Sequence, residues 1–173
     1  LEPGEITVSA SFGGPFVSAI GYAPMPLFSI GANYGIVKDF DVEAGLGVTS
    51  AVFGIMHIDA GVNWRPWLSL YWRPGLLLGA KGILTTNFEK GNTRFYPDVS
   101  GTLFWQFHPQ WLSYVGLDNW FELSQLRYDG NEQKQHWLPT VHTGITFSKR
   151  VWSFQVEGKW YLPFTDATKH TEK

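Results

Sequence analysis

Apolar and polar residues alternate with a period of two along most of this chain. In the first clear segment, the apolar residues occupy the even positions Phe28, Ile30, Ala32, Tyr34 and Ile36. The odd positions between them hold Ser, Gly and Asn. The same alternation recurs in residues 41–49, 56–64, 68–78, 94–107 and 152–164. Because successive side chains of a strand point to opposite faces, this pattern predicts β-strands with one apolar and one polar face.

Three further segments alternate less regularly. Residues 111–123 and 134–148 each keep an apolar face, and we predict a strand in both. Residues 5–22 are expected to form two short strands, because Gly13, Gly14 and Pro15 interrupt them. The predicted strands are therefore joined as four hairpins preceded by a short N-terminal pair.

Short polar connections join the predicted strands, and aromatic residues flank each of them. These connections are centred on residues 38–39, 65–66, 108–110 and 149–150. Longer connections are expected at residues 81–93 and 124–135. The aromatic residues gather at the two ends of the strands: Trp64, Trp67, Trp105, Trp111 and Trp152 near the short connections, and Trp120, Trp137 and Phe164 at the far ends. Two aromatic girdles around an apolar band are typical of a protein that crosses a membrane.

The composition narrows the class of protein further. Nine Trp residues and an aromatic content of 17% are unusual for a soluble sheet, in which each indole needs both burial and a hydrogen-bond partner. Acidic and basic residues nearly balance, 15 against 13, so no nucleic-acid partner is expected. The chain has no Cys, which excludes disulfides and a cysteine nucleophile. No apolar run approaches the length of about 20 residues that a membrane-spanning helix needs.

The length of 173 residues predicts a single domain, 1–173. We expect this domain to end in a short polar tail, 165–173, directly after the last alternating segment. The chain begins at Leu1 without a signal-like segment, and we expect that an export signal has been removed.

Residues 30–45, with the sequence IGANYGIVKDFDVEAG, resemble the strand–turn–strand units of small bacterial outer-membrane β-barrel proteins. The resemblance is one of pattern and covers nearly the whole chain. It implies an all-β, antiparallel up-and-down transmembrane β-barrel in the outer membrane of a Gram-negative bacterium, with outer-membrane lipid as a partner. Such barrels favour even strand counts, so we expect ten strands, with eight as the alternative. A soluble barrel with its apolar face inward is disfavoured, because its small interior would not hold so many bulky side chains.

The predicted position of the C-terminus departs from this family. Its members usually place both termini on the side of their short turns. Here the strand after residues 149–150 runs away from the short connections, so the tail is expected beside the longer ones. The working surface is therefore expected on the side of the longer connections and the termini.

The polar face carries acidic and basic residues that we expect to point into the barrel lumen: Asp41, Glu43, His57, Asp59, Arg73, Arg94, Asp98, Asp118, Glu122, His142, Glu157 and Lys159. An unpaired buried charge is costly, so these side chains are expected to pair across the interior and plug it. No spaced metal-ligand motif accompanies them, and we expect no metal and no other cofactor.

An alternative interpretation is an outer-membrane enzyme that processes lipid or peptide. His57 and Asp59 lie two residues apart and share the polar face of one predicted strand, so the carboxylate could orient the imidazole as a general base. Ser69 on the neighbouring predicted strand would be the nucleophile. The chain has no Gly-x-Ser-x-Gly motif around a serine, and we therefore favour a role without catalysis.

Two non-catalytic functions fit the predicted barrel. A narrow solute channel is disfavoured, because ten strands enclose a small lumen that the long polar side chains would fill. The polar segments 87–93 and 127–134, together with the C-terminal tail, would form a surface for docking a partner. We therefore expect a structural or accessory subunit that binds other envelope proteins through its longer loops and termini.

Overall fold

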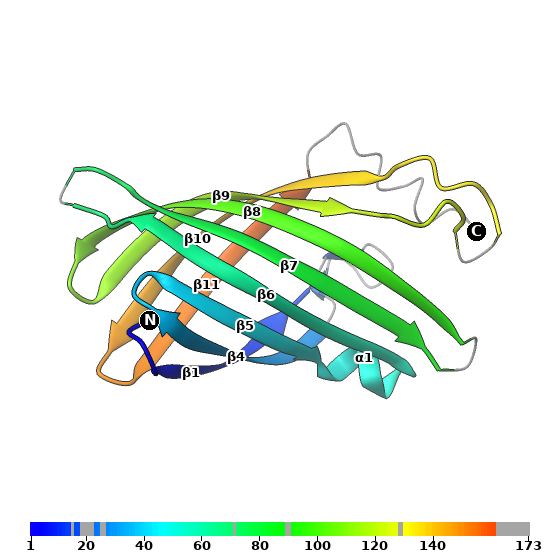
Figure 1. Ribbon diagram of the computed structural model, residues 1–173, viewed down its shortest axis with the longest axis horizontal. Coiled ribbons are helices and arrows are strands. Elements are labelled where there is room, and N and C mark those ends of the chain that lie inside the picture. The colour runs from blue at the N-terminus through cyan, green and yellow to red at the C-terminus, as the bar shows by residue number, and fades with distance from the viewer. Residues whose placement is uncertain are drawn as a thin grey trace. The chain divides into compact units, whose positions relative to one another are not determined.

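The computed structural model describes residues 1–14, 16–17, 23–24, 27–70, 72–88, 91–127 and 130–161. Apart from the short helix α1 (Val48–Val52), the regular elements are strands, which confirms the predicted all-β class (Figure 1). The strands are β1 (Ile6–Gly13), β2 (Phe16–Val17), β3 (Ala23–Pro24), β4 (Leu27–Val37), β5 (Phe40–Gly47), β6 (Ile55–Trp67), β7 (Gly75–Asn87), β8 (Asn92–His108), β9 (Trp111–Phe121), β10 (Trp137–Lys149) and β11 (Trp152–Tyr161). Within the described ranges, no helix has the length and apolar character that a membrane crossing needs.

Most of the strands belong to one sheet with a simple order. Nine strands are hydrogen-bonded in the order β1-β4-β5-β6-β7-β8-β9-β10-β11. The pairing is antiparallel in the registers of β1 with β4, β9 with β10 and β10 with β11. Strands β2 and β3 form a separate two-stranded sheet. The predicted antiparallel up-and-down arrangement is therefore confirmed.

The strand count differs from both predicted values. The main sheet has nine strands, not ten or eight, because residues 5–22 supply it with one strand instead of two. That strand, β1, pairs with β4 along its whole length and ends at the predicted break. The segment after the break contributes β2, which pairs locally with β3. The sheet order ends at β1 on one side and at β11 on the other, so its closure into a barrel stays a prediction.

The predicted turn at Arg65 and Pro66 is wrong. Strand β6 continues through both residues, and the chain reverses direction in residues 68–74 instead. An isolated antiparallel bridge between Leu70 and Arg73 closes this connection. A proline disrupts a strand only where its missing N–H is needed, so Pro66 is tolerated near the end of β6.

The predicted strand 68–78 is confirmed only for residues 75–78, and the predicted long connection 81–93 is wrong. Strand β7 begins well after residue 68, and it continues so far that only residues 88–91 separate it from β8. The alternation is obscured here because two large apolar residues, Ile83 and Leu84, are adjacent. Pairing with the neighbouring strands keeps this segment extended in spite of its irregular pattern.

The remaining connections agree with the sequence to within one or two residues. Short turns join β4 to β5 at residues 38–39, β8 to β9 at residues 109–110 and β10 to β11 at residues 150–151. The longer connection between β9 and β10 spans residues 122–136. Helix α1 occupies the place where the predicted strand 41–49 was expected to end.

In this sheet many polar side chains are buried and many large apolar side chains are exposed, which is the reverse of a soluble sheet. Among the described residues, the buried hydrophobic side chains are Ile83 and Tyr114. The buried polar ones include Asp98, Asp118 and His142. Exposed large apolar side chains occur on every strand of the main sheet, as exemplified by Val8, Ile30, Leu46, Val62, Leu78, Val99, Leu117, Ile145 and Val156. The apolar face that the alternation predicts is therefore the exposed face.

The contacts divide the chain into two compact units, which we describe separately. Unit 1 comprises residues 1–63 and 81–96, and unit 2 comprises residues 64–80 and 97–173. Strands β6, β7 and β8 contribute residues to both units. The single domain 1–173 stays a prediction, and its tail, 165–173, lies outside the described residues.

The turn between β10 and β11 yields a prediction about stability. Arg150 has a φ of 56° and is the first of the two residues between the paired positions Lys149 and Trp152. A side chain in this left-handed region costs about 1–2 kcal/mol, and hairpin turns of this kind favour Gly there. We expect Arg150→Gly to raise the free energy of unfolding by up to about 1 kcal/mol, measured by urea titration. The control is Asp39→Gly, because Asp39 has a φ of 64° but Asp tolerates this region, so a smaller change is expected. A loss of stability in Arg150→Gly would contradict the turn geometry.

Candidate functional site

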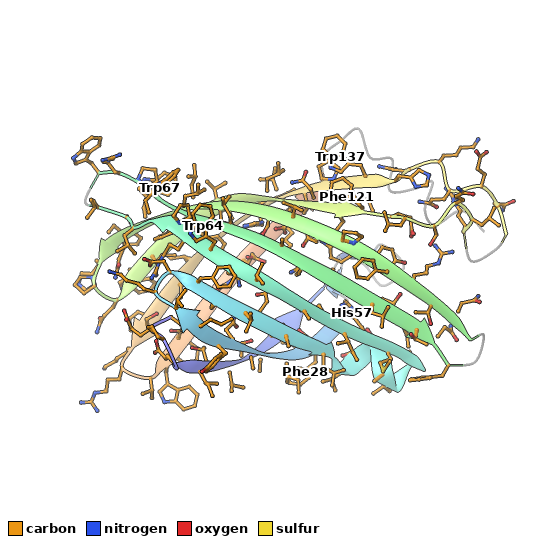
Figure 2. All side chains as sticks on the ribbon, viewed as in Figure 1. Phe28, His57, Trp64, Trp67, Phe121 and Trp137 are labelled. Atoms are coloured by element: carbon orange, nitrogen blue, oxygen red, sulfur yellow. The ribbon has the colours of Figure 1, made fainter. Side chains whose placement is uncertain are left out.

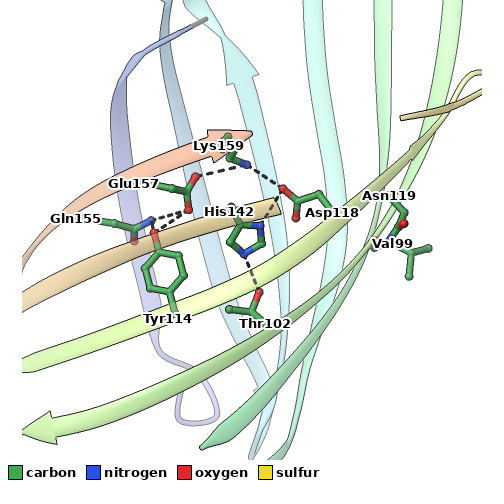
Figure 3. Close-up of polar contacts among 9 residues, drawn as sticks. All are labelled: Val99, Thr102, Tyr114, Asp118, Asn119, His142, Gln155, Glu157 and Lys159. Atoms are coloured by element: carbon green, nitrogen blue, oxygen red, sulfur yellow. Dashed lines mark hydrogen bonds and ion pairs between the residues drawn. The ribbon is translucent and has the colours of Figure 1, made fainter. Parts of the chain in front are cut away.

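A row of side chains on the polar face of unit 2 connects four strands. Thr102 of β8 and His142 of β10 both lie in register with Gly116 of β9, and Lys159 of β11 lies in register with His142. The imidazole of His142 passes over the glycine and reaches Thr102, with 3.1 Å between Nε2 and Oγ1 (Figure 3). A Cβ atom at position 116 would overlap this imidazole. The absence of a side chain at Gly116 therefore allows the His142 imidazole to cross β9.

A second side chain crosses a strand in the opposite direction. Tyr114 of β9 lies in register with Gly144 of β10, and its hydroxyl donates to Oε2 of Glu157 on β11 at 2.7 Å. The side-chain amide of Gln155 donates to the same phenolic oxygen at 2.7 Å. A Cβ atom at position 144 would overlap the phenol. The rings of Tyr114 and His142 lie 5.9 Å apart, so the two crossings sit side by side and tie β8, β9, β10 and β11 together.

Opposite charges compensate one another within this network. Oδ2 of Asp118 lies 3.2 Å from Nδ1 of His142 and 3.0 Å from Nζ of Lys159 (Figure 3). The same ammonium group lies 3.4 Å from Oε1 of Glu157. Asp118 and His142 are buried, whereas half of the Lys159 side chain is exposed. The four predicted lumen residues Asp118, His142, Glu157 and Lys159 are thus brought together, as expected for buried charges that need partners.

Unit 1 holds a separate polar cluster on β5 and β6. The amide nitrogen of Asn63 donates to Oδ1 of Asp41 and to Oε2 of Glu43, at 3.0 Å each. Nearer the start of β6, Nε2 of His57 lies 3.9 Å from Oδ2 of Asp59, which is beyond hydrogen-bond distance. The predicted lumen residues Asp41, Glu43, His57 and Asp59 therefore lie in unit 1, as does Arg94, and the His57–Asp59 pair is a loose ion pair.

The predicted nucleophile, Ser69, does not lie on a strand. It belongs to the connection 68–74, where its hydroxyl donates to the carbonyl of Arg73 and accepts from the backbone N–H of Gln106. These contacts anchor the connection to β8. Ser69 belongs to unit 2 and His57 to unit 1, so the structure assigns the predicted catalytic residues to different units.

The remaining predicted lumen residues have different surroundings. Arg73 is exposed in the connection 68–74, with its guanidinium 5.9 Å from the ring centre of Trp72. Asp98 on β8 is only 2% exposed, and both Asp98 and Arg94 make further polar interactions. Glu122 follows β9 and accepts a hydrogen bond from the backbone N–H of Ser124 at 2.8 Å. Arg73 and Glu122 are therefore the predicted lumen residues that the structure places in connections and not on strands.

The sequence did not predict three members of the unit 2 network: Thr102, Tyr114 and Gln155. All three lie at polar positions of the alternating pattern, but nothing in the pattern gives their partners. The available signal is a glycine at a polar position of one strand beside a large polar side chain on the next. Recognising it requires the register between strands, which the alternation does not give.

The aromatic residues predicted as girdles lie near strand ends. Five of them are exposed: Trp64, Trp67, Trp111, Trp137 and Trp152. Trp105 and Trp120 are partly exposed, and Phe164 lies outside the described residues. Figure 2 shows Trp67 and Trp137 projecting away from the ribbon, and the indole N–H of Trp137 donates to Asn119 at 3.1 Å. Their place at a membrane interface stays a prediction.

In the part of the chain that the structure describes, no group of three or more His, Cys, Asp or Glu side chains could hold a metal ion. Comparison of the chain with family models, curated proteins and solved structures found no match. Functional proposals therefore rest on the geometry of the sheet and of its two polar clusters.

The glycine crossings yield a prediction about packing. Gly116→Ala places a Cβ against the His142 imidazole and the carbonyl oxygen of Gly101, so we expect a loss of about 1–3 kcal/mol in the free energy of unfolding. Gly101→Ala is the matched control, because a Cβ there would meet one Leu78 methyl group at an ordinary 3.7 Å. Chemical denaturation of the two variants measures the difference, and equal stabilities would contradict the crossing.

Proposed function

We propose that this chain is an integral protein of the bacterial outer membrane with a structural or accessory role. The observation that carries the proposal is the exposed apolar face, which extends over all nine strands of the main sheet. Soluble monomers rarely expose contiguous apolar patches larger than a few hundred Å². Lipid is the simplest cover for a face that extends across a whole sheet, and the polar residues on the opposite face fit a lumen.

Insertion into lipid places a further demand on the sheet. Every backbone N–H and C=O within the hydrocarbon region must be hydrogen-bonded, so the outer edges of β1 and β11 also need partners there. We therefore propose that the sheet closes into a transmembrane β-barrel in the membrane. The closed barrel removes the exposed edges, which would otherwise be a site of aggregation.

The polar clusters favour a structural role over a channel. In unit 2, Asp118, Glu157 and Lys159 are bound to one another and to neighbouring side chains. In unit 1, Asn63 holds both Asp41 and Glu43. Charged side chains engaged in this way strengthen the sheet from inside, and they are poorly suited to passing a solute along the lumen.

The connection 122–136 supports partner docking. Its described residues contact one another, with a bridge between Leu126 and Glu132 and a hydrogen bond from the side-chain amide of Gln133 to the carbonyl of Gln135 at 2.6 Å. Yet Leu123 and Leu126 are 61% and 57% exposed. A connection that presents exposed apolar side chains is suited to binding another envelope protein. The other predicted docking segment, 87–93, comprises the last residue of β7, the short connection 88–91 and the first two residues of β8.

A charge on the exposed apolar face tests the membrane assignment. Leu117 is near the middle of β9 and partly exposed, so Leu117→Arg would be nearly neutral in a protein surrounded by water. In a bilayer the same change is expected to cost about 2–4 kcal/mol. Denaturant titration of protein refolded into liposomes measures this cost. Val151→Arg is the control, because this turn residue is 90% exposed and lies outside the strands. Equal folding of both variants in liposomes, or full solubility without detergent, would contradict insertion.

The docking proposal predicts the effect of removing the two exposed leucines. The double variant Leu123→Glu, Leu126→Glu is expected to fold normally but to lose a specific cross-link to an envelope protein in intact cells. Val151→Glu, which changes an even more exposed apolar residue in a short turn, should keep the cross-link. Mass spectrometry of the cross-linked product measures the loss, and an unchanged cross-link in the double variant would refute docking through this connection.

A further inference from the structure

Three residues of the unit 2 network have the geometry of a hydroxyl–imidazole–carboxylate relay. Oγ1 of Thr102 lies 3.1 Å from Nε2 of His142, and Nδ1 of the same imidazole lies 3.2 Å from Oδ2 of Asp118 (Figure 3). A hydroxyl within reach of a base that a third group orients is the common arrangement of an activated nucleophile. It is independent of the predicted His57, Asp59 and Ser69.

The carboxylate of Asp118 determines the direction of proton transfer between Thr102 and His142. The contact between Oδ2 of Asp118 and Nδ1 of His142 is an ion-pair contact, and Nδ1 makes no hydrogen bond in this structure. A negative charge 3.2 Å from Nδ1 nevertheless favours the His142 tautomer with its proton on that nitrogen. Nε2 is then the acceptor, and the hydroxyl of Thr102 donates to it. This is the proton direction that a general base needs to activate an alcohol.

Burial decreases along the relay toward the hydroxyl. Asp118 and His142 are 8% and 6% exposed, whereas Thr102 is only partly buried. Gly116, the residue between Thr102 and His142 in the row, adds no side chain over the pair. Asp118 and His142 are thus shielded, while Thr102 is partly exposed.

We propose that Thr102 is the nucleophile of an esterase site, with His142 as its general base and Asp118 as a positioning residue. This activity goes beyond the proposed structural role and does not depend on the membrane location. The substrate class is a short-chain carboxylic ester that arrives from water, because the relay lies on the polar face. The apolar face, where a lipid acyl chain would lie, is on the other side of the sheet.

The reaction balances as an ordinary ester hydrolysis. Oγ1 of Thr102 bonds to the carbonyl carbon while its proton passes to Nε2 of His142. The bond from carbon to the alcohol oxygen then breaks, and the same proton leaves with the alcohol. Water, deprotonated by His142, attacks the acyl-threonine and releases the carboxylic acid, which restores the hydroxyl.

The test uses the purified full-length chain in detergent. A fluorophosphonate probe is expected to label Thr102, which peptide mass spectrometry locates, and the protein is expected to hydrolyse p-nitrophenyl butyrate. Thr102→Val should abolish labelling and hydrolysis, and Thr102→Ser should retain both. His142→Gln should lower the hydrolysis rate about 10²- to 10⁴-fold. Asp118→Asn should lower kcat with little change in KM, which a purely structural defect would not do.

Thr86→Val is the matched control, because Thr86 is a strand threonine bonded to Thr93 and lies outside the network. It should leave labelling and hydrolysis unchanged. An unlabelled Thr102 in the wild-type protein, or hydrolysis that persists in folded Thr102→Val, overturns the proposal. Hydrolysis of phospholipid in mixed micelles without hydrolysis of the short ester overturns the substrate class. If Thr102→Val does not fold, the labelling site in the wild-type and Thr102→Ser proteins decides.

Discussion

Antiparallel pairing of backbone groups determines which side chains of this protein share a face. Along the paired strands β8, β9, β10 and β11, one face presents Val99, Leu117, Ile145 and Val156, and the other holds the buried network of Asp118 and His142. Hydrogen bonds between strands satisfy the backbone without a conventional apolar core. The sheet can therefore expose its apolar face and bury its polar one, an arrangement that lipid stabilises and water does not.

Glycines on the polar face give the buried network its form. Gly116 and Gly144 allow His142 and Tyr114 to cross a neighbouring strand in opposite directions and to reach Thr102 and Glu157. Long polar side chains can thus find partners two strands away without distorting the ladder. The crossing of β9 by His142 stabilises the sheet and also brings the imidazole to the Thr102 hydroxyl. The structural proposal and the catalytic proposal therefore depend on the same contact.

The sequence predicts the faces of the strands well, but it predicts their partners poorly. Alternation is a local property, so segments such as 28–36 and 94–107 are found correctly. Part of β7 is missed because the adjacent Ile83 and Leu84 interrupt the alternation. Pro66 is mistaken for a turn because the sequence does not show which residues of the neighbouring strands lie beside it. For the same reason Asp118 and His142 are predicted as lumen residues, whereas Thr102 is not recognised as their partner. Contacts between strands depend on register, which alternation leaves open.

The central claim is that the exposed apolar face lies against lipid. The absence of native Cys allows single cysteines to be placed at positions 113–117 of β9 and labelled with a fluorophore in liposomes. Quenching by brominated lipid measures contact with acyl chains, and quenching by iodide measures contact with water. We expect lipid quenching at Val115 and Leu117 but not at Tyr114 or Gly116, which lie on the polar face, with iodide showing the reverse order. Iodide quenching at all of these positions, or lipid quenching without a period of two, would contradict the account.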